Sequence, residues 1–288
     1  MLLAYAGQGY YGFQRNPGVK TIEEDLLLAL FKVGYINEQI LNNSRLIRLD
    51  RASRTDKGVS ALGQVVSLKL PINASVGEIN ANLSPEIRAV ALVKVTQGFS
   101  SRTYSNARSY SYTLPTFAFA HLTADSSLLF WLSMELRKQI DAVLRLFLGS
   151  HSFHNFTTGK TPLESSAFRT IISFICGEPF IIDGIEFVII RIKGKSFMLH
   201  QIRKMVGLVI AIVRGLTSLE TLRKSLAKTV VNIPLAPSVG LLLEKVHYKR
   251  YNRKYEGDGI HTSLHWSKWR REVDSFKKRL IMPLLIKA

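Results

Sequence analysis

The residues best suited to chemistry lie between Arg51 and Ala61, where the sequence is RASRTDKGVSA. Asp56 stands between Arg54 and Lys57, whose positive charges suit a carboxylate that acts as a nucleophile or a base. The segment is polar, holds one glycine and precedes an apolar run, so we predict a loop presented by a strand. From local sequence alone, a surface turn is the commoner role for such an aspartate.

A hydrolase with an aspartate nucleophile would need a second carboxylate beside Asp56 to act as the acid. Asp50 is the one close candidate in the sequence, and it precedes Asp56 by six residues. That spacing places the two carboxylates poorly within a tight loop. The sequence therefore disfavours a hydrolase.

Two histidines, His151 and His154, are separated by two residues, a spacing that is compatible with metal ligands. No cysteine or carboxylate neighbours them, so we do not predict a metal site there. Cys176 is the one cysteine of the chain, which excludes an internal disulfide and a zinc site built from several cysteines.

Alternating strands and helices are expected to position these groups. Thr21 and Glu24 have the spacing of a capping box, which predicts a helix that ends at Gly34. A second capping pattern, Ser75 with Glu78, predicts a short helix. Hydrophobic periodicity predicts strands at about 64–70, 108–114 and 185–193 and helices at about 134–148 and 198–216.

The order of these elements predicts an α+β protein with two halves. We expect an N-terminal half over residues 1–115, which carries the Asp56 loop, and a C-terminal half over residues 116–288. A loop-rich stretch at about 116–127 is expected between them.

The chain carries 39 Lys and Arg against 21 Asp and Glu in 288 residues, a net charge of +18. Such an excess predicts a polyanionic partner. Nucleic acid is favoured over a membrane because the longest apolar runs, such as 207–213, are too short to span a bilayer.

The segment 249–279 contains ten basic residues and five aromatic ones. This composition suits phosphate contacts and stacking on bases, although an amphipathic helix over the core would have the same composition. Lys195, Lys204 and Arg214 are expected to add to the basic surface.

Five ordered motifs resemble the tRNA pseudouridine synthase A family, in its eukaryotic tRNA pseudouridine synthase 1 branch. The central motif is RASRTDKGVSALGQVVSLKL, and APSVGLLLEKVHYKRYN extends the similarity toward the C-terminus. The others are LLAYAGQGYYGFQRN, ARSYSYTLPTFAFAH, HSFHNFT and RIKGKSFMLHQIRKMVGLVIAIVRG. The resemblance spans about residues 2–265.

The resemblance implies an RNA-modifying isomerase that converts uridine to pseudouridine without a cofactor. It implies the pseudouridine synthase fold, in which two ferredoxin-like α/β halves join their antiparallel sheets into one mixed sheet with a central basic cleft. Asp56 matches the catalytic aspartate, Tyr110 the tyrosine that packs on the target base, and Arg203 the arginine that pairs with the catalytic carboxylate. Arg54 matches the arginine that enters the RNA when the target nucleotide flips out, and Gly240 and Leu241 match a loop that lines the uridine pocket.

We also expect RNA contacts from a further set of residues: Lys57, Arg108, His200, Lys204, Lys249 and Arg250. Without the resemblance, the sequence is equally compatible with Tyr110 as a core tyrosine and with His200 as a structural histidine. The implied partner is tRNA, with messenger or small nuclear RNA as further substrates and no membrane. A monomer is expected, with a homodimer as the alternative, in the nucleus, the mitochondrion or the cytoplasm. A catalytically silent RNA-binding protein on the same scaffold is the alternative function.

Overall fold

The computed structural model describes residues 1–121 and 130–286, which form two compact units. Unit 1 comprises Met1–Arg108 and Leu242–Ala288, and unit 2 comprises Ser109–Leu241. These ranges differ from the expected halves, 1–115 and 116–288. The C-terminal segment groups with the N-terminal part because Leu242 and Leu243 pair with β3 of unit 1.

Unit 1 is built on a sheet with the strand order β4-β1-β3-β10. β1 is antiparallel to β3 and β4, whereas β10 runs parallel to β3. Every residue of β3 is buried, so side chains cover both faces of this central strand. The strands are β1 (Leu2–Tyr5), β2 (Asp50–Arg51), β3 (Ser60–Ser67), β4 (Ile87–Ala91) and β10 (Leu241–His247), with β2 paired to β3.

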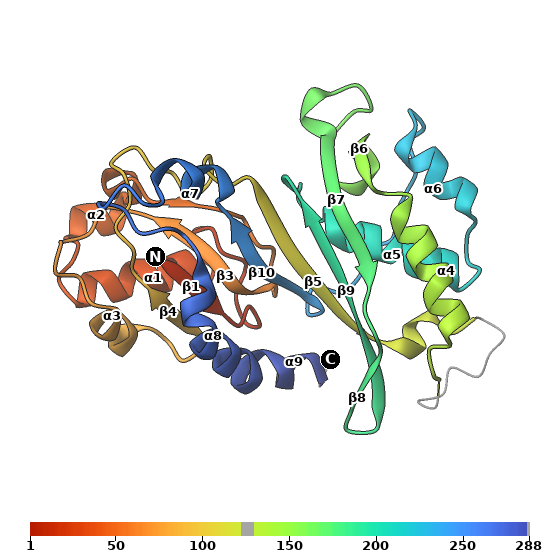
Figure 1. The fold of residues 1–288 in the computed structure, drawn as a ribbon, viewed down its shortest axis with the longest axis horizontal. Coiled ribbons are helices and arrows are strands. Elements are labelled where there is room, and N and C mark those ends of the chain that lie inside the picture. Colours follow the sequence, from red (N-terminus) through yellow and green to blue (C-terminus); the bar gives the residue numbers. More distant parts are fainter. Residues whose placement is uncertain (122–129, 287–288) are drawn as a thin grey trace. The chain divides into compact units, whose positions relative to one another are not determined.

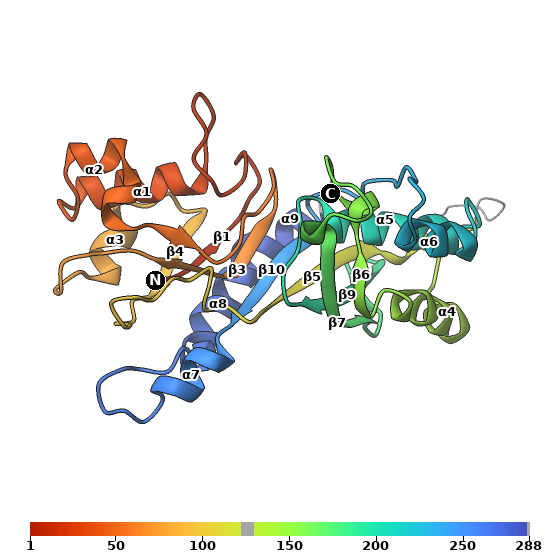
Figure 2. The same cartoon turned by 90° about the horizontal axis from the view of Figure 1, so that it is seen from above.

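Helices lie on both faces of the unit 1 sheet, and Figure 2 shows α1 and α8 on opposite faces. Two of the predicted caps are present. Thr21 accepts a hydrogen bond from the Glu24 amide at the start of α1, and Ser75 accepts one from the Gly77 amide at the start of α3. The helices are α1 (Ile22–Lys32), α2 (Glu38–Asn42), α3 (Val76–Asn82), α7 (Lys249–Tyr255), α8 (Arg270–Phe276) and α9 (Met282–Ile286).

Unit 2 has the strand order β5-β9-β7-β6, with β8 as a short hairpin partner of β9. β6, β7 and β9 are successively antiparallel. The helices of this unit lie together on one face of its sheet (Figure 1). The elements are β5 (Ala107–Pro115), α4 (Met134–Arg145), β6 (Gly149–Ser152), β7 (Phe168–Cys176), β8 (Phe180–Ile182), β9 (Ile185–Gly194), α5 (Gln201–Val213) and α6 (Leu219–Leu226).

The mixed α+β class predicted from the sequence is confirmed. One detail is corrected, because the β3–β10 pair makes the sheet of unit 1 mixed rather than antiparallel. The joining of the two sheets and a basic cleft between them stay predictions. The expected loop-rich stretch begins with a 3₁₀ helix at Thr116–Phe119, and its residues 122–127 lie outside the described residues. In the described ranges no helix is long and apolar enough to cross a membrane.

Candidate active site

Asp56 lies in a loop between β2 and β3, as the sequence predicts. The Val59 amide donates to the Asp56 carbonyl at 3.1 Å and closes a turn in which Gly58 has a φ of +78°. Glycine adopts this left-handed conformation without the steric cost that a Cβ brings. Arg54 and Lys57 are exposed and Asp56 is partly buried. The strand that follows begins at Ser60, four residues before the predicted start, so the loop joins the core strand directly.

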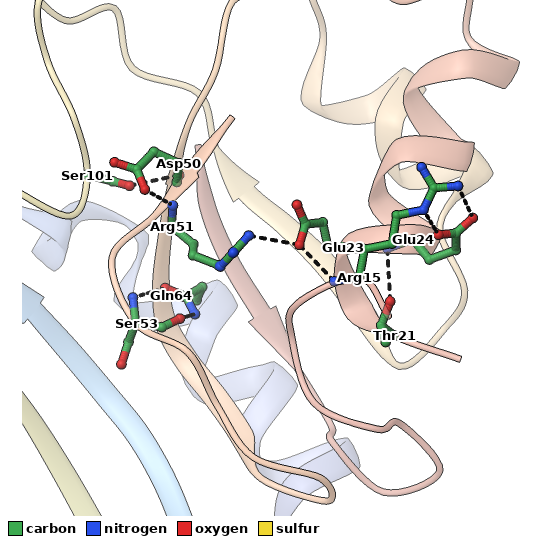
Figure 3. Close-up of polar contacts among 9 residues, drawn as sticks. All are labelled: Arg15, Thr21, Glu23, Glu24, Asp50, Arg51, Ser53, Gln64 and Ser101. Atoms are coloured by element: carbon green, nitrogen blue, oxygen red, sulfur yellow. Dashed lines mark hydrogen bonds and ion pairs between the residues drawn. The ribbon is translucent and has the colours of Figure 1, made fainter. Parts of the chain in front are cut away.

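A buried hydrogen-bond network fixes the inner side of this loop. The hydroxyls of Thr55 and Tyr5 lie 2.8 Å apart, and the Gln64 side-chain amide donates to the Tyr5 hydroxyl at 3.3 Å. Gln64 also donates to the Ser53 carbonyl at 2.7 Å and accepts from the Ser53 amide at 3.2 Å (Figure 3). Tyr5 and Gln64 are fully buried. Buried polar groups that satisfy one another in this way hold a unique geometry.

A glycine-containing segment packs against the outer side of the loop. The Phe13 amide donates to the Thr55 carbonyl at 3.2 Å, and the Gly58 amide donates to the Tyr10 carbonyl at 3.1 Å. A Cβ on Gly12 would lie 2.6 Å from the Thr55 carbonyl oxygen, so only glycine permits this approach. The backbone on either side of Asp56 is thus fixed by residues that lie about 45 positions away in the sequence.

An ion pair anchors the base of the loop. Arg51 pairs with Glu23 of α1 at 2.8 Å, and Glu23 also accepts from the Arg15 amide at 2.8 Å (Figure 3). The side chains of Arg51 and Glu23 are 18% and 5% exposed, so little solvent screens the pair. Arg108 donates from two of its guanidinium nitrogens to the Ala52 carbonyl, at 3.2 and 2.7 Å. Arg108 therefore supports the loop, whereas its expected RNA contact stays a prediction.

Asp50, the second carboxylate considered as the acid of a hydrolase, makes structural hydrogen bonds. Asp50 lies in β2, where its side chain accepts hydrogen bonds from the Ser100 hydroxyl and the Arg51 amide. Its own carbonyl accepts from the Ser101 hydroxyl at 2.8 Å (Figure 3). These contacts make Asp50 part of the loop's support, in agreement with the argument against a hydrolase.

The expected base-packing residue, Tyr110, lies in unit 2 on β5. Tyr110 is 5% exposed, and its ring meets the ring of Phe197 edge to face with centroids 5.3 Å apart. Aromatic pairs favour this arrangement because the ring edge is positive and the face negative. Phe197 thus fixes the plane of the Tyr110 ring, and the packing of that ring on a base stays a prediction.

Arg203 and the 236–240 loop are brought together in unit 2. The Arg203 Nε donates to the Ala236 carbonyl at 2.8 Å, and the Ala236 amide donates back to the Arg203 carbonyl at 3.2 Å. The Gly240 carbonyl accepts from the Thr113 amide at 2.9 Å. A Cβ on Gly240 would lie 2.9 Å from the ring of Tyr112. The predicted pocket residue Gly240 therefore lies on a loop that β5 and α5 both hold, and Leu241, the other one, is the first residue of β10.

Tyr112 gives this loop a further anchor. Its hydroxyl donates to the Pro237 carbonyl at 2.9 Å. Burial raises the pKa of Tyr112 well above its ordinary value, while the nearby positive charge of Arg203 acts in the opposite direction. The hydroxyl therefore remains a neutral hydrogen-bond donor at physiological pH.

Two of the residues expected on the basic surface, Lys204 and Arg214, make main-chain contacts. The Lys204 ammonium donates to the carbonyls of Asn155 and Thr157 at 3.0 and 3.4 Å, and burial lowers its pKa. The Arg214 Nε donates to the Ala120 carbonyl at 3.1 Å. Both cations therefore support the fold of unit 2, and their expected contribution to the basic surface stays a prediction.

The remaining RNA-binding candidates are exposed or partly buried. Lys249 and Arg250 begin α7 in unit 1 and are exposed, as is Lys195 in unit 2. His200 precedes α5 with a φ of +62° and is partly buried, and its RNA contact stays a prediction.

The paired histidines also make local contacts. The His151 ring bonds the Leu148 carbonyl at 2.7 Å, and the buried His154 ring lies within hydrogen-bond distance of the Ser152 hydroxyl and the Thr229 carbonyl. Within 1–121 and 130–286, no group of three or more His, Cys, Asp or Glu residues is arranged to hold a metal ion.

Sequence reasoning did not identify the residues that support the Asp56 loop. Tyr5, Gln64 and Gly12 are far from Asp56 in the chain, and their types are common in ordinary cores and turns. The one local signal was the spacing of Gly7, Gly9 and Gly12, since glycines clustered in a short loop often mark a close backbone approach.

The chain is similar to known proteins over nearly its whole length. The family model described as tRNA pseudouridine synthase matches residues 143–249. The "Pseudouridylate synthase 1 homolog" proteins of Mus musculus and Homo sapiens are each 46% identical over 291 residues, covering 99% of this chain and 69% and 68% of theirs. The "tRNA pseudouridine synthase 1" of Yarrowia lipolytica is 30% identical over 364 residues, covering 97% of this chain and 69% of its own.

These relatives and the matched model define a class of RNA-modifying isomerases. The chain belongs to the tRNA pseudouridine synthase family and is an enzyme that converts uridine in RNA to pseudouridine. The family resemblance predicted from the sequence is thereby confirmed.

Proposed function

We propose that this chain modifies uridines of tRNA and that Asp56 is its catalytic carboxylate. The observation that supports this role is the construction of the loop. Buried hydrogen bonds fix Thr55 on one side of Asp56, and a close backbone contact fixes Gly58 on the other. Asp56 itself remains partly accessible between the exposed side chains of Arg54 and Lys57. A preorganised carboxylate beside accessible cations suits a reaction on a polyanion.

The reaction requires little beyond a carboxylate. The bond between uracil N1 and ribose C1′ breaks, the uracil rotates, and C5 bonds to C1′; the C5 proton is lost and N1 gains one. No electron is gained or lost overall, and no water is consumed. The Asp56 carboxylate would add to C1′, add to uracil C6, or remove the C2′ proton to give a glycal, and the proposal leaves these three routes open.

Other residues have roles carried over from the family. A target base must leave the helical stack, which costs a few kcal/mol, and stacking on an aromatic ring returns about 1–3 kcal/mol. Tyr110 would pack on that base, and Arg54 would occupy the vacated space. Arg203 would pair with the Asp56 carboxylate and keep it ionised away from water, where an unpaired carboxylate is costly. Gly240 and Leu241 would line the uridine pocket.

Phosphate contacts would supply most of the RNA affinity. The net charge of +18 and the exposed cations Lys57, Lys249 and Arg250 support such contacts, with His200 as a further candidate. We extend the proposal to messenger and small nuclear RNA as further substrates. A monomer in the nucleus is proposed, with a homodimer and with the mitochondrion or cytoplasm as the alternatives, on the resemblance to the eukaryotic branch.

The experiment is sequencing of pseudouridine in total RNA from cells with and without this protein, with Asp56→Ala as the control. We expect tRNA positions that lose pseudouridine without the protein and recover it only with the wild-type form. Recovery by Asp56→Ala would overturn the role of Asp56. Unchanged tRNA with altered messenger RNA would overturn the proposed substrate. Imaging of the tagged protein in the same cells tests its location.

A further inference from the structure

Lys57 follows Asp56 directly, and its side chain makes a specific contact. Its ammonium lies 3.8 Å from the centroid of the Tyr11 ring. Lys57 is exposed and Tyr11 is 52% exposed, so an aromatic ring and a cation lie together at the surface beside the candidate catalytic residue. The negative face of an aromatic ring attracts an ammonium in this position.

The Tyr11 ring stands on a segment that is fixed to the Asp56 loop. The Tyr11 amide donates to the Lys20 carbonyl at 2.9 Å. On either side of Tyr11, the Tyr10 carbonyl accepts from the Gly58 amide, and Gly12 packs on the Thr55 carbonyl. The backbone segments that carry Tyr11 and Lys57 are therefore joined by hydrogen bonds and close packing, although the two residues are 46 positions apart in the sequence.

This contact orients Lys57 without consuming its hydrogen-bonding capacity. A free lysine side chain occupies many rotamers and must lose them to bind a fixed phosphate. A ring beneath the ammonium restricts those rotamers in advance, while the N–H groups that point away from the ring stay available as donors. A nucleotide whose C1′ comes to Asp56 brings its own phosphates close to the next residue of the loop.

We propose that Lys57 binds a backbone phosphate of the RNA beside the target nucleotide and that Tyr11 is the positioning residue that holds Lys57 for this contact. The inference rests on the proposed role of Asp56. It adds Tyr11, which lies within the motif LLAYAGQGYYGFQRN but has no role assigned from the sequence, and it specifies a phosphate oxygen as the ligand of Lys57.

Four variants test the inference: Tyr11→Leu, Tyr11→Phe, Lys57→Gln and the double variant Tyr11→Leu/Lys57→Gln. The probe is an unmodified tRNA transcript that the wild-type protein modifies, and affinity is measured against salt in Asp56→Asn protein to prevent turnover. We expect Lys57→Gln to weaken binding about tenfold at low salt and to reduce the slope of log affinity against log salt by nearly one. Tyr11→Leu should weaken binding about two- to fivefold, and Tyr11→Phe should not change it.

The double variant separates positioning from direct contact. If Tyr11 acts through Lys57, Tyr11→Leu has no further effect once Lys57 is Gln. Equal effects with and without Lys57 would mean that Tyr11 touches the RNA itself and would overturn the positioning role. Lys32→Gln is the matched control, an exposed lysine at the far end of α1, ten residues and about 15 Å along the helix from Ile22, whose amide bonds Gly12.

Two outcomes distinguish this inference from the proposed function. An unchanged salt slope in Lys57→Gln would overturn the phosphate contact while leaving Asp56 unaffected. Pseudouridine formation by Asp56→Asn would instead overturn the proposed function. In otherwise wild-type protein, the Tyr11→Leu change should raise KM with kcat nearly constant and leave the free energy of unfolding unchanged, and a loss of folding stability in place of the KM effect would show a purely structural role.

Discussion

The hydroxyl of Tyr5 lies 2.8 Å from the hydroxyl of Thr55, the residue immediately before Asp56. This buried contact links the first strand of the chain to the candidate catalytic loop. Tyr5 also accepts a hydrogen bond from Gln64, so its hydroxyl closes a network among three elements. The position of Asp56 thus depends on the core of unit 1 as well as on its own loop.

We expect Tyr5→Phe to lower the free energy of unfolding by about 1–3 kcal/mol, because Thr55 and Gln64 lose a buried partner. It should also lower kcat about tenfold, since the loop loses its inner anchor. Denaturant unfolding and single-turnover kinetics measure the two effects. Tyr35→Phe is the control for the rate, because the Tyr35 hydroxyl bonds Glu78 and the Ser75 amide at the start of α3 and none of the residues of the Asp56 loop. A normal rate for Tyr5→Phe would show that the network does not position Asp56.

Alanine substitutions at two glycines with similar backbone conformations distinguish the effect of backbone strain from the effect of displacing the Asp56 loop. Gly12 and Gly9 have φ values of +92° and +84°, but a Cβ would meet the Thr55 carbonyl oxygen at 2.6 Å only at Gly12 and nothing within 4 Å at Gly9. Alanine should cost about 1–2 kcal/mol of stability at both positions. Gly12→Ala should in addition lower kcat about 100-fold, because it displaces the backbone beside Asp56. Equal rates for the two variants would contradict the close packing of the two loops.

The buried ion pair at the base of the loop should be sensitive to loss of one partner. Glu23→Gln leaves Arg51 buried without its carboxylate, and we expect a loss of about 3 kcal/mol in the free energy of unfolding. Glu135→Gln, which breaks the exposed pair with Lys138, should have no measurable effect. Replacing Glu23 and Arg51 together should cost less than Glu23→Gln alone. An additive double variant would show that the pair is not coupled.

Arg203 has a structural and a proposed catalytic role that substitutions can separate. Arg203→Ala removes the hydrogen bond to the Ala236 carbonyl and the charge proposed to pair with Asp56, so we expect lost activity and about 1 kcal/mol of lost stability. Arg203→Lys keeps the charge without the guanidinium geometry and should retain part of the activity. An unchanged rate in Arg203→Ala would show that the pairing is wrong.

Local features of the fold could be predicted from the sequence, because short-range interactions determine them. The Thr21 cap and the strand that holds Tyr110 lie where spacing and alternation placed them. The alternation predicts a start at residue 64, four residues after β3 begins, because Ser60–Ser67 is buried on both faces and its first residues do not alternate.

Long-range contacts could not be predicted from the sequence, because they join segments that are far apart in the chain. Nothing near Lys204 in the sequence indicates that carbonyls about 47 residues away would accept its hydrogen bonds. The approach of Gly12 to Thr55 and the parallel pairing of β10 with β3 likewise depend on chain segments that meet only in the folded protein. Asp56 itself was identified by the family motif, whereas the residues that fix its loop required the structure.

The most direct test of the central claim is the amount of pseudouridine that purified Asp56→Asn forms in an unmodified tRNA transcript. The substitution keeps the size of the side chain and removes the charge and the nucleophilic oxygen. We predict that the variant folds, binds the transcript within about threefold of the wild-type affinity and forms no pseudouridine. Pseudouridine at a rate near that of the wild type would contradict the assignment of Asp56 as the catalytic carboxylate.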